Sequence, residues 1–159
     1  MEVTTERRML YEYKKLNAYP MLCMNGCEFD SVRYNDSYLN FVMKDGFLKG
    51  AGHRTNSAML SVEGGEDNIC ILVSEEISSE DGYPGYRTRR LNMDELVKLV
   101  KSNSVVIHEE YHSANRMLLR GEIIRPQKLL TFNHRRQLFE LKFSSEKDLR
   151  MFYYFNDTI

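Results

Sequence analysis

The sequence predicts one α+β domain over residues 1–159, with about five helices and a small, mostly antiparallel sheet that includes a C-terminal hairpin. Three observations lead to this fold class. A chain of 159 residues is long enough to bury one hydrophobic core without disulfides. Apolar residues recur at helical spacing in several segments, and short apolar runs typical of strands lie between them. Helix and strand patterns do not alternate regularly, which argues against a doubly wound parallel sheet.

The first half of the chain contains two predicted helices and one predicted strand. Residues 5–17 carry an apolar stripe at helical spacing. Residues 36–45 begin at a candidate N-cap, Asp36, and end before Gly46, which suits a helix C-terminus. Residues 68–73 (NICILV) form a short apolar run and predict a buried strand.

A predicted loop and the clearest helix follow. Residues 78–90 (SSEDGYPGYRTRR) combine Gly, Pro, Ser and charged residues, and this composition predicts a loop. Asn92 can cap a helix, and Glu95 completes a capping box with it. We therefore expect a helix from Asn92 to about Ser102.

The last third of the chain is predicted to hold two more helices and the hairpin. Residues 104–120 predict a helix, because apolar residues recur there at positions i, i+4, i+7 and i+11. Residues 128–132 and 137–143 flank a polar turn and predict the hairpin. Ser144 or Ser145 caps the last helix. The apolar set of residues 104–120, which we expect to be more buried than the arginines of the same segment, consists of Ile107, Tyr111, Ala114 and Leu118.

The segment HEEYH contains an H-E-x-x-H motif formed by His108, Glu109 and His112. On a helix this spacing brings both imidazoles to one face, where they can bind one zinc ion, and Glu109 can act as general base on a zinc-bound water. The motif therefore allows a zinc-dependent hydrolase of the metallopeptidase type. Two features count against it. Glu110 stands where such motifs usually have an uncharged residue, and Leu118 stands where some zinc peptidases have a third histidine.

Two other arrangements of these residues stay open. The sequence favours the simpler one, in which the three residues lie on a partly solvated flank of the helix and bind no metal. In the other, Cys23 and Cys27 form a C-x3-C turn that combines with His108 and His112 into a four-ligand structural zinc site. We therefore expect no cofactor, with zinc as the alternative if either metal site forms.

The second half of the chain is basic and rich in arginine. Residues 1–80 contain 8 Lys or Arg and 13 Asp or Glu, whereas residues 81–159 contain 14 and 10. The guanidinium group binds carboxylates and phosphates through parallel hydrogen bonds and stacks on bases. We therefore expect an acidic macromolecular partner, protein or nucleic acid. The expected contact residues are Tyr83, Tyr86, Arg87, Arg89, Arg90, Arg116, Arg120, Arg135 and Arg136.

Several features of the composition indicate a cytosolic protein with no membrane contact. No apolar run approaches the ~20 residues needed to cross a bilayer, and the charged N-terminus has no apolar signal-peptide core. Three cysteines are too few, and odd in number, for a disulfide framework. The sequence carries no signature of a nucleic-acid-binding family, and its pI of about 6.4 is low for a dedicated nucleic-acid-binding protein.

The segment VRYNDSYLNFVMKDGFLKG, residues 32–50, resembles the opening strand and helix of some ADP-ribosyltransferase-like proteins. The resemblance implies that an early Arg or His contacts NAD and that a later Glu before a strand is catalytic. Glu122, in RGEII, would be that residue. The resemblance includes no diagnostic triad of the family.

The sequence thus favours three functions in order. The first is a small cytosolic regulatory or interaction protein with an arginine-rich binding surface, and the composition would suit a phage or viral accessory protein. The second is a zinc-dependent hydrolase that uses HEEYH. The third is an ADP-ribosyltransferase-like enzyme.

Overall fold

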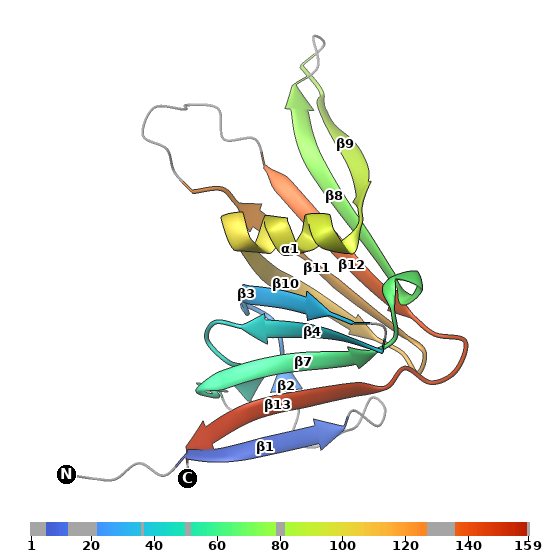
Figure 1. Ribbon diagram of the computed structural model, residues 1–159. Coiled ribbons are helices and arrows are strands. Elements are labelled where there is room, and N and C mark those ends of the chain that lie inside the picture. Colours follow the sequence, from blue (N-terminus) through green and yellow to red (C-terminus); the bar gives the residue numbers. More distant parts are fainter. Residues whose placement is uncertain are drawn as a thin grey trace, which may run out of the picture.

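Two antiparallel β-sheets of five strands each form the framework of the protein (Figure 1). The computed structural model describes residues 6–12, 22–35, 37–49, 52–78, 82–126 and 136–158. We call the sheet with strand order β1-β13-β7-β4-β3 sheet I, and the sheet with order β10-β11-β12-β8-β9 sheet II. The short strands β2, β5 and β6 form a third, small sheet.

The strands of sheet I come from both ends of the chain. They are β1 (Glu6–Glu12), β3 (Phe29–Tyr34), β4 (Tyr38–Met43), β7 (Ser57–Glu63) and β13 (Met151–Thr158). Sheet II is formed by β8 (Ile69–Ser78), β9 (Pro84–Leu91), β10 (Ser104–His112), β11 (Arg116–Ile124) and β12 (Gln137–Ser144). The small sheet is formed by β2 (Leu22–Cys23), β5 (Leu48–Lys49) and β6 (His53–Arg54), and a 3-10 turn, η1 (Glu66–Asn68), leads into β8.

The hydrophobic core lies between the two sheets. Burial alternates along the strands, as in β12, where every second side chain from Gln137 to Phe143 is buried. Aromatic rings from the two sheets meet in this layer. The ring of Phe41 in sheet I lies edge-on to that of Phe143 in sheet II, with centroids 5.4 Å apart, and Phe29 lies 6.2 Å from Phe139. These contacts join both sheets into one core.

The two sheets are also joined along one edge. Glu28, just before β3, forms a β-bridge with Val106 of β10. Next to that bridge, the amide of Gly26 donates to the carbonyl of Ile107, and the amide of Ile107 donates to the carbonyl of Cys27. The other outermost strands of sheet I and sheet II among the described residues are β1 and β9.

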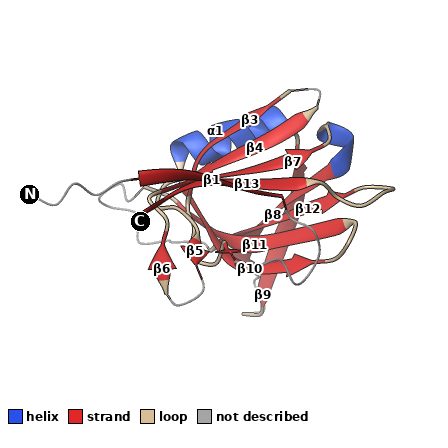
Figure 2. Cartoon of the chain, turned by 90° about the horizontal axis from the view of Figure 1, so that it is seen from below, coloured by secondary structure: helices blue, strands red, loops and turns tan. Residues whose placement is uncertain are grey.

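One α-helix is present among the described residues, α1 (Met93–Ser102), and it packs beside β3 (Figure 2). Its capping box is the one that the sequence predicts, since Asn92 accepts from the amide of Glu95 and Glu95 accepts from the amide of Asn92. The phenol of Tyr34 donates to Asp94 over 2.6 Å. That hydrogen bond to a carboxylate raises the pKa of Tyr34 to about 12.

The prediction of an α+β domain with about five helices and a small sheet is wrong, because most of the described chain is strand. Residues 6–12 and 38–43 are strands where helices were expected, and residues 151–158 form β13 in place of the last helix. The residues of β13 alternate between buried and less buried positions, which is the period of a strand. The predicted loop at 78–90 contains β9, whose register against β8 is continuous.

The most consequential correction concerns residues 104–120, which form the hairpin of β10 and β11 and not a helix. The segment begins with three consecutive β-branched residues after Ser104, which favour a strand. Of its expected buried set, Ile107 is fully buried, but Tyr111 is 53% exposed and Ala114 is exposed. The spacing that predicted one helix face therefore belongs to two strands and their turn.

Three predicted elements are confirmed. They are the helix that begins after Asn92, the strand expected at 68–73, of which residues 69–73 lie in β8, and the strand at 137–143, which is β12. The other half of the expected hairpin, residues 128–132, lies outside the described residues, and the described partners of β12 are β11 and β8.

Candidate functional site

A β-bulge in β10 decides where the side chains of HEEYH point. The pairing of β10 with β11 shifts between Ile107 and Glu109, so that His108 is the extra residue. His108 and Glu109 are both exposed, whereas Glu110 and His112 are partly buried. Since the bulge reverses the alternation, His108 and His112 lie on opposite faces of sheet II.

The two histidines have different partners, which agrees with their opposite faces. The imidazole of His108 is half exposed and lies 3.5 Å from Glu122 on the outer face, the face of sheet II turned away from sheet I. That of His112 is 14% exposed and lies 3.6 Å from Glu110. Four residues of strand also separate them by about 13 Å along the chain. They are therefore not arranged as the two ligands of one metal ion, and Glu109 does not stand beside a metal-bound water.

The C-x3-C turn is not arranged as half of a zinc site either. Cys27 is fully buried and donates to the carbonyl of Gly46 over 3.2 Å. Burial raises the pKa of the Cys27 thiol to about 11, although the guanidinium of Arg54 lies 3.7 Å away and opposes this shift. Burial also raises the pKa of Cys23, and the nearby carboxylate of Glu110 adds to it. Among the described residues, Cys23 and Cys27 do not join His108 and His112 in a group that could hold a metal ion.

The carboxylate of Glu110 stabilises the C-x3-C turn that contains Cys23 and Cys27. It accepts from the backbone amide of Met24 over 3.2 Å, and it lies beside His112. Among the residues that the structure describes, no group of three or more His, Cys, Asp or Glu side chains is arranged to hold a metal ion. Within those residues, HEEYH belongs to β10, the strand of sheet II that is bridged to the segment just before β3 of sheet I.

The outer face of sheet II is hollowed into a groove of about 520 Å³. Leu72 and Leu138 line it with apolar surface, and the hydroxyls of Ser74 and Thr88 lie 2.9 Å apart across neighbouring strands. His108, Glu109, Arg120, Arg136 and Glu140 also line the groove. On β8, β11 and β12, these residues alternate with the buried residues of the core.

Charges in and beside the groove are matched within the protein. Arg120 stands directly opposite Glu140 in the pairing of β11 with β12, and its Nε donates to that carboxylate over 3.0 Å. Arg136 lies 3.8 Å from Glu122, whose other oxygen faces His108. Cross-strand pairs of opposite charge stabilise a sheet. The groove is therefore a mixed, charge-balanced surface and not a strongly basic one.

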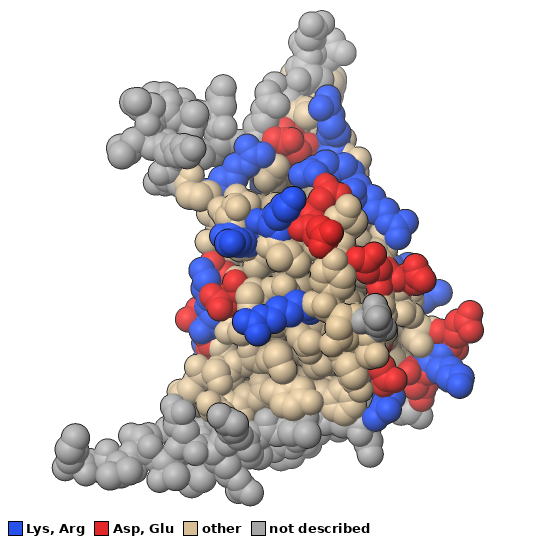
Figure 3. Space-filling model, viewed as in Figure 1, with Lys and Arg blue, Asp and Glu red and all other residues tan. Residues whose placement is uncertain are grey.

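The edge strand β9, together with Tyr83 just before it, carries the other part of the expected binding surface. Tyr83 and Tyr86 are 78% and 49% exposed, and the arginines of β9 are exposed as well. Arg89 lies 3.6 Å from Glu95 of α1. In Figure 3, Lys and Arg gather over β9 and α1, with Asp and Glu among them.

Two arginines of β9 differ from Arg89 because they have no ion pair with the described residues. Arg87 stands opposite Glu75 in the register of β8 and β9, but Glu75 pairs with Arg125 at 3.5 Å. Arg90 stands opposite Leu72, so no acid faces it across the strand pair. Their charges are thus open to a partner, in contrast to those of the groove.

The structure divides the residues that the sequence grouped as one surface. Arg116 lies four residues before Arg120 on β11, about 13 Å away along the strand, and stands opposite Ser144 at the far end of sheet II. Arg135 lies outside the described residues. Two groups remain: the exposed tyrosines and arginines of β9, and the paired arginines of the groove.

Sequence reasoning missed the residues that line the groove from β8 and β12, namely Leu72, Ser74, Leu138 and Glu140. Strict alternation in QLFELKF assigns Leu138 and Glu140 to one face, and this signal could have found half of the set. Pairing of β12 with β8 could not be read from the sequence, because the two strands are about 60 residues apart.

The segment at 32–50 does not form the strand and helix that its resemblance to ADP-ribosyltransferase-like proteins implies. It contains the end of β3 and the whole of β4, two paired strands of sheet I, followed by β5. Glu122, the residue that the resemblance would make catalytic, is on β11. Its carboxylate lies near the side chains of both His108 and Arg136.

Comparison with protein-family models, with curated proteins and with solved structures finds no match to this chain. Within the described residues, no helix has the length and apolar character needed to span a membrane.

Proposed function

We propose that this chain is a small cytosolic interaction protein that binds an acidic protein partner through the tyrosines and arginines of β9. One observation carries the proposal. Tyr83 and Tyr86 are exposed beside Arg87 and Arg90, which have no ion pair with the described residues. Tyrosine and arginine are the residue types that most often dominate binding energy at protein interfaces.

The surroundings of β9 favour an acidic protein over a nucleic acid. Glu75 and Glu76 lie on the neighbouring strand, and Glu95 lies beside Arg89. The groove arginines are each paired with a glutamate, and the whole chain carries a net charge of −1. A phosphate backbone, with its regular and dense negative charge, would meet these carboxylates as well as the arginines. A protein segment has fewer acidic residues and can place them beside the arginines and away from these carboxylates.

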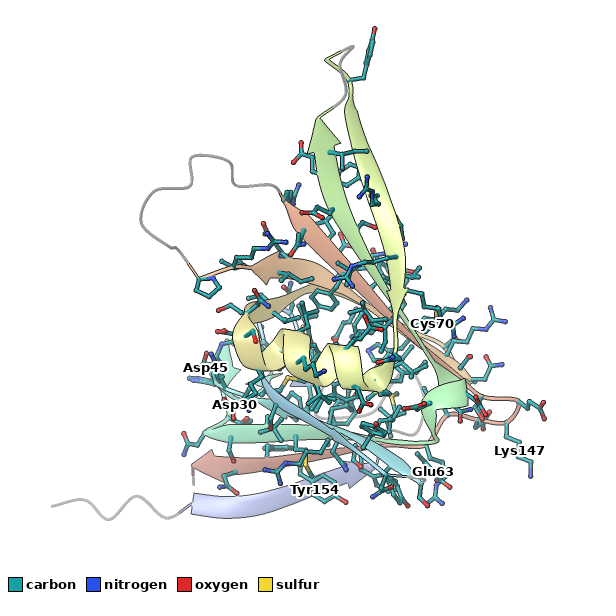
Figure 4. All side chains as sticks on the ribbon, turned by 45° about the horizontal axis from the view of Figure 1, so that its top comes forward. Asp30, Asp45, Glu63, Cys70, Lys147 and Tyr154 are labelled. Carbon is teal, nitrogen blue, oxygen red and sulfur yellow. The ribbon has the colours of Figure 1, made fainter. Side chains whose placement is uncertain are left out.

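The test compares two double variants that lose the same charge. Arg87→Ala with Arg90→Ala removes the two unpaired arginines of β9. Arg33→Ala with Lys147→Ala removes two exposed cations that make no ion pair with the described residues, and Lys147 projects away from β9 at the opposite end of sheet II (Figure 4). Binding of fluorescent polyglutamate and of a short DNA duplex is titrated at two salt concentrations.

We expect the β9 variant to bind polyglutamate about tenfold more weakly than wild type, because an exposed charge pair contributes up to about 1 kcal/mol. The control variant should bind as wild type does. Binding should weaken with salt, since screening shortens to roughly 8 Å at physiological ionic strength. Equal binding by all three proteins would remove β9 from consideration, and tighter binding to DNA than to polyglutamate would favour a nucleic-acid partner.

A further inference from the structure

We propose that the acidic partner binds by strand addition: an extended segment pairs antiparallel with the free edge of β9 and places two acidic residues, three positions apart, opposite Arg87 and Arg90. This inference rests on the proposed function, because it assigns a binding mode and a partner motif to the same surface. Three observations support it. One edge of β9 is unpaired among the described residues, exposed arginines lie along the strand, and these arginines project on both of its faces.

Among the described residues, one edge of β9 is unpaired along the whole strand. On one side, β9 pairs with β8 over eight residues, from Leu91 opposite Ile71 to Pro84 opposite Ser78. On its other side, no strand of the described part of the chain pairs with it. Figure 1 shows the β8–β9 hairpin rising clear of sheet I. An edge strand presents unpaired amides and carbonyls, which an extended peptide can use to extend the sheet.

The other edges of the two sheets offer less. The edges of β3 and β10 approach each other at the bridge between Glu28 and Val106, and α1 packs beside β3. The sequence of β1, ERRMLYE, contains two glutamates and two arginines, whereas that of β9, PGYRTRRL, contains three arginines and no acid. An acidic strand is therefore attracted to β9 and not to β1.

The faces of β9 define what an added strand must carry. Tyr86 and Arg90 project on the outer face of sheet II, in line with Leu72 and the rest of that face, whereas Arg87 and Arg89 project on the face toward α1. Residues opposite each other in an antiparallel pair share a face. An added strand thus needs one acid on each face, at positions i and i+3, to meet Arg90 and Arg87.

Two further contacts refine this motif. Arg89 is already held by Glu95, so the residue opposite it needs no charge. The residue after the second acid stands opposite Tyr86, whose ring is 49% exposed, and an apolar side chain there would cover it. The motif that fits β9 is therefore acid-x-x-acid-apolar, read from the N-terminus of the partner.

A second copy of the chain is disfavoured at the same edge in the register centred on Thr88. Antiparallel pairing of two β9 strands about Thr88 would place Arg87 of each copy opposite Arg89 of the other. Like charges directly opposite each other destabilise a strand pair. Arg87, which accepts an acid from the added strand, therefore also contributes to the repulsion between two copies in this register.

The experiment uses an acetylated and amidated octapeptide of valine and threonine, with glutamate at its third and sixth positions and a fluorescent label. Its affinity for the full chain is measured by anisotropy. We expect the Arg87→Ala/Arg90→Ala variant to bind it at least tenfold more weakly and the Arg33→Ala/Lys147→Ala control to bind it as wild type does. A variant with Arg87→Glu and Arg90→Glu should prefer the same peptide with lysine at both positions.

Two peptides with a single N-methyl group test the strand addition itself. Neighbouring amides of an extended strand point to opposite sides, so methylation at position four or at position five removes an amide that faces β9 in one peptide and solvent in the other. We expect one form to bind as the parent does and the other to lose at least tenfold. A purely electrostatic contact would treat both forms alike.

The outcomes separate this inference from the proposed function. If the parent and both methylated peptides bind equally, and the β9 variant still binds weakly, strand addition is overturned and the acidic-partner function stands. If glutamates at positions three and seven serve as well as three and six, the motif is overturned. If neither the peptide nor polyglutamate binds wild type, the proposed function itself is overturned. Equal binding by wild type and a folded β9 variant would also overturn it.

Discussion

The β-bulge at His108 depends on a glycine across the strand pair. Gly121 stands opposite Ile107, where the register of β10 shifts, and opposite Phe139 on β12. A Cβ at this position would collide with the carbonyl oxygen of Val106 and lie 2.6 Å from the ring of Phe139. The close approach of two strands and an aromatic ring therefore requires a residue without a side chain. This one position helps to set the direction of every side chain in HEEYH.

We expect Gly121→Ala to destabilise the protein by about 3 kcal/mol or more, because neither backbone nor a packed ring can move away cheaply. Urea unfolding, followed by tyrosine fluorescence, measures the loss. Gly85→Ala is the matched control, since its nearest neighbour, a side-chain carbon of Ile77, would lie 3.4 Å away. A cost below about 1 kcal/mol at Gly121 would mean that the pairing at the bulge is different.

The thiol of Cys27 gives a second test at the scale of one residue. Its pKa is raised by burial from the ordinary 9.0 to about 11, so folding favours the protonated thiol. The stability from this group is complete below pH 9 and is lost as the pH rises to about 11. Cys27→Ala should therefore show a smaller decrease in unfolding free energy between pH 9 and pH 11 than wild type.

Alkylation provides an independent measurement of the same residue. Iodoacetamide at pH 8 should label Cys27 last of the three cysteines, because Cys23 and Cys70 are partly exposed and the thiolate is the reactive form. Labelling of Cys27 before Cys70 in folded protein would contradict both its burial and its raised pKa.

At the scale of elements, α1 is stabilised mainly by its own ends and by one buried face. Met93, Leu96 and Val100 are buried, and the capping box satisfies amides of the first turn. Most of the strands differ from it, because their hydrogen bonds come from segments far away in the chain, as β7 and β13 show. The formation of these strands thus depends on pairing with segments far away in the chain, whereas the formation of α1 depends mainly on residues close to it in the sequence.

We expect Asn92→Ala to lower the unfolding free energy by about 1 kcal/mol, since the side chain accepts from the amide of Glu95 over 2.9 Å. Lys98→Ala, on the exposed side of the same helix, should change it by less than about 0.5 kcal/mol. Chemical denaturation of both variants provides the comparison. Equal effects would show that the cap contributes nothing beyond ordinary helix propensity.

At the scale of the whole molecule, the contact between the two sheets depends on rings that cross the core. Phe41 and Phe143 meet edge-on between sheet I and sheet II, and Phe29 lies near Phe139. Within the described residues the β-bridge between the sheets lies at one edge, and these rings are part of the core cluster that fills the space between the two layers. Edge-to-face pairs contribute about 1 kcal/mol beyond the area they bury.

A double-mutant cycle with Phe41→Leu and Phe143→Leu should give a coupling free energy of about 1 kcal/mol. The control cycle combines Phe47→Leu with Phe143→Leu. Phe47 is fully buried but has its ring contacts with Tyr153 and Phe155 of sheet I. That cycle should give a coupling near zero. Similar values in both cycles would show that the packing of the two sheets does not depend on the ring pair.

The sequence by itself determined the features that depend on near neighbours. Asn92 and Glu95 form their capping box within four residues, so the helix could be predicted. The apolar run at residues 68–73 and the alternation in β12 likewise identified strands. The tyrosines and arginines of β9 are exposed, as their composition suggested, although the segment is a strand and not a loop.

Only the tertiary structure decided the features that depend on pairing between distant segments. The spacing from Ile107 to Leu118 fits one helix face as well as it fits parts of two strands, and the pairing of β10 with β11 chose the second. The bulge then separated His108 from His112, and the pairing of Glu75 with Arg125 left Arg87 without an ion pair. A local pattern records how often a side chain is buried. It does not record which distant strand buries that side chain. The pairing of distant strands placed His108 and His112 on opposite faces, and it left one edge of β9 unpaired among the described residues.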